Sequence, residues 1–424
     1  MIDNSADGTQ SPCEQPGALD LEAKIGRVGG RLSHCVVQLL AALPNGTTRP
    51  AGLSRALGVN KDLASKLLIA SGKRDPLAAA YYMPGPEALR KVLNGALERN
   101  VDRSIIGELE VAVREFETLV RDEAGGRAAL DAMISAWLPE ARARFEMANR
   151  QGAYKAMANI KGLTTEVALH CVLVHPAAHG DRHDLVTLFG CIGLRRIRPG
   201  VPIRVSTGMS GPGSETQEAL TLDGRPVDVF SADTLLAEFC TQPLPPIQTH
   251  KHSVFVTYVI ASDRIGLESS ADLFFAEYAR GFLDQYNPSP GLRASHSADI
   301  EIPTQELLFD VFLHRDVWPG VEPELDTYDT ALYGEVNVND RSRDIDRLDL
   351  LETIQPMDMG ISACRVASIP KYVDMLRFIC ERRGWDPDAF RGFRCHTHYP
   401  VYGSQVIMAF DRRSPQSVRP DQSV

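Results

Sequence analysis

The sequence predicts an α+β protein of more than one domain, with an all-α N-terminal domain, a helical connector and a C-terminal α+β body around a mostly antiparallel sheet. The chain has 424 residues, more than one ordinary hydrophobic core holds. Before Gly162, apolar residues recur every three or four positions, which is the period of amphipathic helices. After Gly162 they gather in short runs bounded by Gly, Pro or Asp, which is typical of strands.

Composition and cysteine usage limit the class of protein. With 44% hydrophobic and 24% charged residues, the chain has the make-up of a soluble globular protein. No apolar run reaches the roughly 18 residues of a membrane helix, so we expect no membrane partner. Residues 1–18 lack the basic and apolar regions of a signal peptide and are expected to be disordered. The eight cysteines include no C-x-x-C pair, which predicts reduced thiols and a cytoplasmic protein.

The N-terminal domain, residues 19–103, is predicted to consist of short helices. A first helix runs from Leu19 to Leu43, and a later one begins at Pro86, because proline is tolerated at the first helical position. Between them, two apolar-periodic segments flank a Gly58-Val59-Asn60 break, and each is too short to be stable alone. They must pack on each other, with a shared core of Leu53, Leu57, Val59, Leu63 and Leu67.

The residues of the break favour a tight turn between two crossing helices. Gly58 is free to take the positive φ that such a turn needs, and the small Ser54 lies where the two backbones approach. Asn60 can accept a hydrogen bond from a free backbone N–H of the second helix, which therefore begins at Lys61. With the leucines of that helix facing inward, four residues face outward: Lys61, Asp62, Ser65 and Lys66.

The stretch from Pro50 to Lys73 resembles the helix-turn-helix of DNA-binding proteins, a resemblance that covers roughly residues 20–100. It implies that the second helix is a recognition helix whose N-terminal half meets base edges. Lys61 or Lys66 then donates to guanine or phosphate, Ser65 donates or accepts, and Asp62 accepts from cytosine or repels the backbone. The residues expected to contact DNA are Asn60, Lys61, Ser65, Lys66, Lys73 and Arg74. A helical hairpin used only for packing or protein contact is the alternative.

Charge also favours a polyanionic partner. The segment from Leu21 to Arg103 contains thirteen Lys or Arg and six Asp or Glu, a net charge of +7. Because the whole chain carries −10, the remaining residues carry −17. Phosphate neutralisation supplies most of the non-specific affinity for DNA. A basic module on an acidic body therefore predicts that duplex DNA binds at one end of the molecule.

The connector, residues 104–162, is predicted to be helical. Apolar residues from Ile106 to Val120 follow a 3,4,3,4 spacing, which is the seam that a heptad pattern presents to a partner helix. A second helix, from Leu130 to Phe145, is expected to kink at Pro139. Because a helix-turn-helix monomer covers only one half-site, we expect a homodimer with this connector as a possible interface. A plain bundle helix explains the same spacing.

The body, residues 163–412, is predicted to alternate short strands with few helices, and residues 413–424 form a loose tail. Helices are expected at Ala271 to Leu283 and at Lys371 to Arg383. Strands are expected at 165–174, 185–192, 201–206, 253–261, 300–302, 307–313 and 405–410.

Histidines are the best candidates for a second function. His175, His179 and His183 stand four apart, but a proline and a glycine between them break a helix, so only a loop can bring them together. The pairs at 250/252 and 396/398 have the spacing of one strand face, with Cys395 pointing the other way. Such pairs can chelate zinc or iron, and polar histidines on the wet face of a sheet explain them equally well. We therefore name no metal ligand and no cofactor.

Four further patterns are incomplete. Gly208 to Pro212 lacks the final glycine of a nucleophile elbow, and His314-Arg315-Asp316 lacks the rest of a kinase catalytic loop. The acidic run from Asp340 to Asp349 lacks the glycine and glutamate of a calcium loop, which favours a solvated helix or turn. The glycines at 208–213 lack the Lys-Ser/Thr of a P-loop. Nearby arginines, which either cradle a phosphate or form an ordinary basic surface, are Arg195, Arg196, Arg198 and Arg204.

Taken together, these observations favour a DNA-binding transcriptional regulator whose body senses a small-molecule ligand or assembles subunits. No catalytic pattern is complete, which favours a protein that is not an enzyme. Two other hypotheses stay open. One is an enzyme, possibly metal-dependent, in which the body acts and the helical domain docks it. The other is a structural or assembly protein that uses its helices for association.

Overall fold

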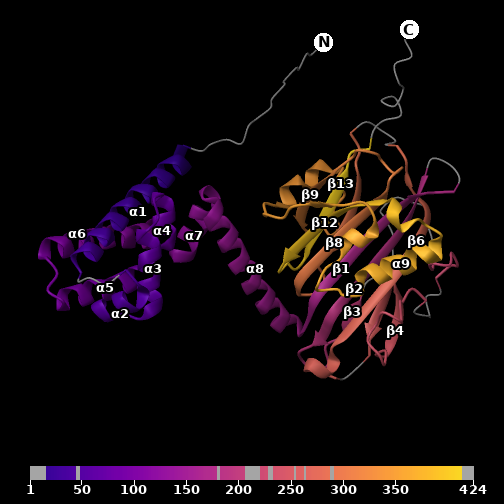
Figure 1. Cartoon of the computed structure of the whole chain (residues 1–424), viewed down its shortest axis with the longest axis horizontal. Coiled ribbons are helices and arrows are strands. Elements are labelled where there is room, and N and C mark those ends of the chain that lie inside the picture. Colours follow the sequence, from indigo (N-terminus) through magenta and orange to yellow (C-terminus); the bar gives the residue numbers. More distant parts are fainter. Residues whose placement is uncertain are drawn as a thin grey trace, which may run out of the picture. The chain divides into compact units, whose positions relative to one another are not determined.

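The protein is described here by a computed structural model. It covers residues 16–43, 48–178, 182–205, 220–227, 233–252, 255–261, 264–286 and 291–412. The chain divides into two compact units, Met1–Glu146 and Met147–Val424 (Figure 1). The first is helical and the second contains the sheets, as predicted for an α+β multidomain protein. Residues 1–15 of the predicted disordered start and the predicted loose tail, residues 413–424, lie outside the described residues. Residues 16–18, also expected to be disordered, belong to the first helix.

The helical unit is built from α-helices of very different length and one π-helical turn. They are α1 (Pro16–Ala42), α2 (Pro50–Leu57), α3 (Lys61–Ser71), α4 (Pro76–Tyr82), α5 (Pro86–Glu98), α6 (Arg103–Thr118), η1 (Leu119–Glu123) and α7 (Arg127–Trp137). The following helix, α8 (Pro139–Lys161), crosses the division between the units.

Prolines and capping side chains set several of these boundaries. Pro86 is the first residue of α5, as predicted. At the start of α4, the Asp75 carboxylate accepts a hydrogen bond from the backbone N–H of Leu77 at 2.8 Å. The kink expected at Pro139 is a break instead, because the residue before a proline is pushed out of the helical region. Leu138 is extended, with φ −116° and ψ 103°, so α7 ends before it and α8 begins after it.

One hydrophobic core joins α1 to α7, so the helices of residues 103–137 belong with those that precede them. Two glycines permit close helix contacts. A Cβ on Gly29 of α1 would lie 2.5 Å from the carbonyl oxygen of Pro76. A Cβ on Gly95 of α5 would lie 2.0 Å from the carbonyl oxygen of Leu57, at the end of α2. The predicted connector is thus divided: α6 and α7 complete the core of the helical unit.

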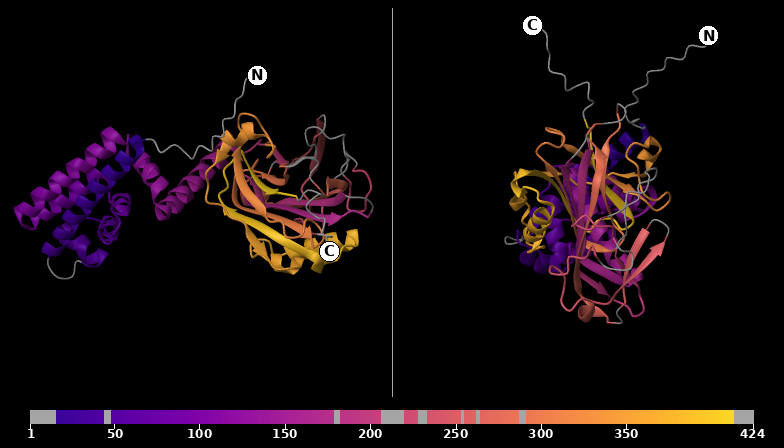
Figure 2. Two further views of the ribbon diagram at one scale, coloured as in Figure 1. Left: turned by 90° about the horizontal axis from the view of Figure 1, so that it is seen from above. Right: turned by 90° about the vertical axis from the view of Figure 1, so that its right-hand side faces the viewer.

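The second unit contains three sheets among its described residues (Figures 1 and 2). The six-stranded sheet has the order β11-β12-β8-β1-β2-β6, the four-stranded sheet β10-β9-β13-β7 and the three-stranded sheet β3-β5-β4. In these strand pairs only β1 and β8 run parallel, so the sheets are mostly antiparallel, as predicted. The strands are β1 (Leu163–Pro176), β2 (Arg182–Arg196), β3 (Ile203–Val205), β4 (Ile247–His252), β5 (Phe255–Ile260), β6 (Ala271–Asp284), β7 (Ala294–Asp299), β8 (Thr304–His314), β9 (Pro323–Asp329), β10 (Arg347–Leu348), β11 (Gln355–Met357), β12 (Phe390–His398) and β13 (Ser404–Phe410).

The six-stranded sheet is covered on both faces. Helix α9 (Tyr372–Arg383) packs on one face, where Leu173 of β1 shares a core with Leu376 and Ile379. On the opposite face, Val172 of β1 shares a second core with Met408 of β13 and other residues of the four-stranded sheet. Alternate residues of one strand therefore enter different cores, as the two-residue period of a strand requires.

A buried ion pair lies under α9. The Arg394 guanidinium on β12 donates to the Asp310 carboxylate on β8 at 2.9 and 2.7 Å, and the Tyr372 hydroxyl donates to the same carboxylate at 2.8 Å. Asp310 is 0% exposed and Arg394 8%. Burial raises the pKa of Asp310, and the neighbouring Arg394 acts against that rise. The pair fixes two strands and a helix relative to one another.

Most predicted elements of the body are present, and two are wrong. Residues 271–283, expected to form a helix, form β6, where pairing with β2 and burial outweigh the helix-forming residues. No strand forms at 300–302; the strand there, β7, ends at Asp299. The predicted helix at Lys371 to Arg383 is α9. Polar strands such as β4 and β9 carry no apolar run that the sequence could show.

Candidate nucleic-acid interface

Helices α2 and α3 are joined by a tight turn. Gly58 takes the left-handed conformation expected of it, with φ 66° and ψ 23°. The Ser54 hydroxyl donates to the carbonyl oxygen of Val59 at 2.6 Å, and the backbone N–H of Val59 donates to the carbonyl oxygen of Ser54 at 3.1 Å. These two bonds close the turn at the predicted point of approach.

Asn60 caps α3. Its side-chain oxygen accepts a hydrogen bond from the backbone N–H of Leu63 at 2.8 Å, and α3 begins at Lys61, as predicted. This is the cap that the sequence predicts, and it engages the side-chain oxygen of Asn60 within the helix. The contribution of Asn60 is to fix where α3 starts and so which of its side chains face outward.

The outer face of α3 carries the side chains that the sequence placed there. The four leucines of the shared core are buried, and Val59 is half-buried. Lys61, Asp62 and Lys66 are exposed, whereas Ser65 is half-buried. Ile69 is 45% exposed and continues the stripe of Lys61 and Ser65 at four-residue spacing. The sequence analysis did not predict an exposed Ile69. Its position outside the buried stripe of residues 63, 67 and 70 was the signal that could have indicated it.

The last two predicted contact residues differ from each other. The Lys73 ammonium lies 2.9 Å from a carboxylate oxygen of Glu140 and 4.3 Å from the centre of the Tyr82 ring. The hydrogen bond with Glu140 raises the pKa of Lys73. Its charge is thus neutralised within the helical unit, which argues against the DNA contact expected of it. Arg74 is exposed.

The helical unit as a whole is not basic, because it also contains the acidic residues that precede and follow residues 21–103. Besides Lys73, three cations of residues 21–103 pair with carboxylates that follow Arg103 in the chain. They are Lys24 with Glu123 at 2.7 Å, Arg31 with Glu115, and Arg90 with Glu117. Residues 1–146 contain 18 Lys or Arg and 19 Asp or Glu, a net charge of −1. The expectation of a basic module therefore does not carry over to the folded unit.

The cations of the α2–α3 face are distinct from those paired ones. Among the described residues, Lys61 and Lys66 of α3 and Arg55 of α2 form no ion pair. Arg55 donates instead to the carbonyl oxygen of Ala51, one turn earlier. Asp62 is the only acidic residue in the stretch 50–74 before Asp75. We call the surface formed by Arg55, Lys61, Ser65, Lys66 and Ile69 the α3 face.

The first histidine cluster does not form. In the β1–β2 hairpin His175 is the cross-strand partner of Asp184, and His183 is that of Pro176, so the two histidines face opposite sides. The His175 ring stacks on Trp385 with centroids 4.7 Å apart, and the His183 ring meets Trp318 edge-on at 5.6 Å. His179 lies outside the described residues. The loop arrangement considered for the three histidines is therefore wrong for these two.

The later histidines are a surface pair. His396 and His398 are exposed on one face of β12, and Cys395, which precedes His396, is buried on the other, as predicted. A ring nitrogen of His396 lies 2.8 Å from a carboxylate oxygen of Glu306. Within the described part of the chain, no three His, Cys, Asp or Glu residues are placed to hold a metal ion. The side chains of His250 and His252 lie outside that part.

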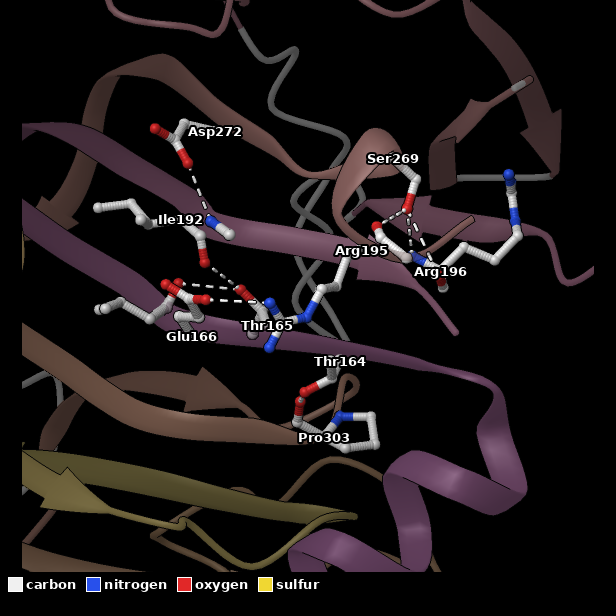
Figure 3. Close-up of polar contacts among 12 residues, drawn as sticks. Thr164, Thr165, Glu166, Ile192, Arg195, Arg196, Ser269, Asp272 and Pro303 are labelled. Atoms are coloured by element: carbon white, nitrogen blue, oxygen red, sulfur yellow. Dashed lines mark hydrogen bonds and ion pairs between the residues drawn. The ribbon is translucent and has the colours of Figure 1, made fainter. Parts of the chain in front are cut away.

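Three of the four arginines considered for a phosphate site are engaged within the body (Figure 3), whereas Arg204 on β3 is exposed. Arg195 lies 3.2 Å from a carboxylate oxygen of Glu166 on the adjacent strand. The backbone N–H of Arg196 donates to the Ser269 hydroxyl at 3.0 Å. Its buried guanidinium donates to backbone carbonyls of residues 260 and 264. Arg198 donates to the carbonyl oxygen of Ile160 at 2.6 Å. The glycine-rich residues 208–213, including the elbow pattern, lie outside the described residues.

The remaining incomplete patterns have structural roles. His314, of the kinase-like triplet, packs against His175 with ring centroids 4.6 Å apart, and Arg315 pairs with Asp386 at 3.5 Å. The acidic run forms a short 3-10 helix, Arg341–Asp346, whose first turn is capped by the Asp340 carboxylate. This agrees with the predicted solvated helix or turn.

Comparison of the chain with protein-family models, with curated proteins and with solved structures gives no match. None of the described helices is both long and apolar enough to cross a membrane. The argument for function therefore depends on the residues and geometry of this chain alone.

Proposed function

We propose that the helical unit binds duplex DNA by placing the N-terminal half of α3 in the major groove. Two features of the fold support this. Helices α2 and α3 are short, packed on each other and joined by a turn with a left-handed glycine, which is the arrangement of a helix-turn-helix. The face of α3 away from the core is exposed from its first residue.

The observation that carries the proposal is that both lysines on the outer face of α3 are exposed and form no ion pair among the described residues. In a unit where Lys24, Arg31, Lys73 and Arg90 are paired with carboxylates, the two lysines of the α3 face are not. Unpaired cations on a helix that lies in the groove can donate to guanine or to phosphate without first breaking an internal ion pair.

Other residues of the α3 face have matching chemistry. The Ser65 hydroxyl can donate or accept at a base edge, and the exposed Ile69 can contact a thymine methyl group. Arg55 on α2 is suited to phosphate, as the first helix of such a motif crosses the backbone. Asp62 accepts from the exocyclic amine of cytosine or excludes other bases.

In this proposal the protein is a transcriptional regulator that acts as a homodimer. One α3 face covers one half-site, and a second copy supplies the other half-site. The body then senses a small molecule or assembles subunits.

Fluorescence anisotropy of a labelled duplex library with the full chain tests the proposal. Lys61→Glu with Lys66→Glu should abolish binding, because both side chains meet phosphate or base in the proposed complex. The fold should be retained, because both side chains are exposed. The matched control reverses two exposed arginines of α6, Arg103→Glu with Arg114→Glu, which changes the net charge equally. Binding should also weaken steeply between about 50 and 200 mM salt.

Two results would overturn it. Equal losses in the two double variants would mean that only net charge matters, and affinity that ignores both salt and Lys61/Lys66 would mean that α3 does not meet DNA. Circular dichroism of each variant verifies that the helices are retained.

A further inference from the structure

A cavity of about 380 Å³ lies at one edge of the four-stranded sheet. Strand β9 forms one of its walls, and β10 together with the residues that follow it forms the other. Every residue that lines the cavity belongs to the continuously described stretch 291–412. Ligand sites in proteins measure about 300–1,000 Å³, so a volume of this size suits a small organic molecule.

Strand pairing explains why the cavity forms at this point. Strand β10 pairs with β9 over two residues, and the pairing ends where Leu348 faces Thr327. In a continued antiparallel register, the next two residues to face each other would be Asp349 and Asp326. Carboxylates directly opposite each other destabilise a strand pair. The two segments part here instead, and both aspartates line the resulting cavity.

The cavity has a polar and an apolar side. Successive residues of a strand point to opposite faces, so on β9 the Leu325 side chain lies on one face and the Asp326 side chain on the other. Leu325 packs against the core between the four-stranded and six-stranded sheets. From the other wall, Asp349 adds a second carboxylate, and Leu348 and Leu350 add apolar surface. A molecule in the cavity therefore meets both carboxylates and leucine side chains.

A third carboxylate in the cavity already has partners. The Glu352 side chain is 6% exposed, and one of its carboxylate oxygens lies 2.7 Å from the guanidinium of Arg150. Its other carboxylate oxygen accepts a hydrogen bond from the Thr327 hydroxyl at 2.9 Å. The charge of Glu352 is thus compensated within the body. Asp326 and Asp349 are the carboxylates at which a ligand cation can bind.

The charges around the cavity favour a cation. Asp326 lies 3.4 Å from Arg347, but that guanidinium is shared with Asp344 at 3.7 Å. The residues that line the cavity include three carboxylates and one guanidinium, a net charge of −2. Residues 323–352 contain nine Asp or Glu and three Arg, a net charge of −6, which concentrates cations near this edge of the sheet. In the described stretches no three His, Cys, Asp or Glu residues are placed to hold a metal ion, so an organic cation suits the cavity better.

We propose that this cavity binds a small organic amine. Its ammonium group lies between Asp326 and Asp349, and its apolar part lies against Leu325, Leu348 and Leu350. The ammonium group relieves the repulsion between the two carboxylates. Burial of the apolar part supplies the affinity that a partly exposed ion pair alone would lack. This site is independent of DNA binding by the α3 face.

Isothermal titration calorimetry of the full chain without DNA tests the site with three probes. The first, 4-phenylbutylamine, carries an ammonium group on an apolar body, and 4-phenylbutyrate carries a carboxylate on the same body. Calcium chloride supplies a cation without an apolar part. We expect saturable binding of the amine with a Kd at or below about 1 mM. Neither 4-phenylbutyrate nor Ca²⁺ should show saturable binding in that range.

Four variants assign the contacts. Asp349→Asn should weaken binding of the amine about fivefold, since one of two partly exposed carboxylates is lost, and Asp349→Asn with Asp326→Asn should abolish saturable binding. Leu350→Ser should also weaken it, through loss of apolar contact. Asp374→Asn on α9 is the matched control and should bind normally, because Asp374 is likewise exposed and lies 3.8 Å from an arginine. Circular dichroism verifies that each variant is folded.

The proposal is overturned if the amine shows no saturable binding to the folded full chain, or if the double aspartate variant binds it like the unaltered protein. Binding of 4-phenylbutyrate or Ca²⁺ as tight as that of the amine would also overturn it. None of these results bears on the α3 face, because no DNA is present.

Discussion

Replacement of Arg394 by methionine should destabilise the body strongly. The guanidinium supplies two hydrogen bonds to Asp310, at 2.9 and 2.7 Å, in a place where that carboxylate is 0% exposed. Once Arg394 is gone, the described residues leave the carboxylate with the Tyr372 hydroxyl as its donor. Removing one partner of a buried ion pair typically costs about 3–5 kcal/mol, because a buried charge is left uncompensated.

Companion variants separate that cost from simple loss of packing. Arg394→Met combined with Asp310→Leu removes both charges, and should recover most of the stability because an apolar pair can replace a buried ion pair at little cost. Tyr372→Phe removes one hydrogen bond to a charged group and should cost about 1.5–3 kcal/mol. These comparisons require only that enough of each variant folds for its unfolding to be measured.

Urea unfolding followed by tryptophan fluorescence is the assay. Trp318 and Trp385 both lie in the body and are 5% and 8% exposed, so their emission reports on its unfolding. The reasoning is refuted if the double variant is less stable than Arg394→Met alone, or if the single variant loses less than about 1 kcal/mol.

Two further predictions concern the α3 cap and the histidines of the body. Asn60→Ala should lower the stability of the helical unit by about 1 kcal/mol through loss of the cap, whereas Asn60→Asp should not, as thermal unfolding followed by circular dichroism will show. Lowering the pH from 6.5 toward 4 should destabilise the body, because burial lowers the pKa of His170 and His183 to about 4 and that of His296 to about 3. As the pH falls, these histidines bind protons in the unfolded chain but not in the folded body. Their contribution to stability is therefore complete above about pH 6.5 and is lost as the pH falls toward 4. Three acids act in the opposite direction, because burial raises the pKa of Glu277 and of Asp299 to about 7 and also raises that of Asp310. They are three groups against five, since burial lowers the pKa of His175 and His314 as well; urea midpoints that rise on acidification to pH 5 would contradict the prediction.

Local signals predicted the turn between α2 and α3 and the start of α3 correctly. Asn60 and Gly58 act over only a few residues, so the start of α3 and the turn before it could be predicted without knowledge of the fold. The exposure of Lys61 and Lys66 followed from the position of the leucines one helical turn away. Lys73 could not be assigned in the same way, because its partner Glu140 is 67 residues distant in the chain.

The same limit explains the errors in the body. The residues of β6 include good helix formers, and only pairing with β2 and burial between layers make them a strand. His175 and His183 were grouped by their spacing, whereas the hairpin register turns them to opposite faces. The cavity between β9 and residues 347–352 arises where two paired segments part, and it has no signature in the sequence.

By itself, the sequence determined the division into a helical and a sheet-containing part, the start of α3 and the side of α3 that carries its lysines. These depend on hydrophobic period, prolines and caps, which act within a few residues. The tertiary structure alone decided which cations remain unpaired, which strands adjoin and where Glu277 is buried. Those properties arise from contacts between residues far apart in the chain, and a linear pattern holds no record of which distant groups will meet.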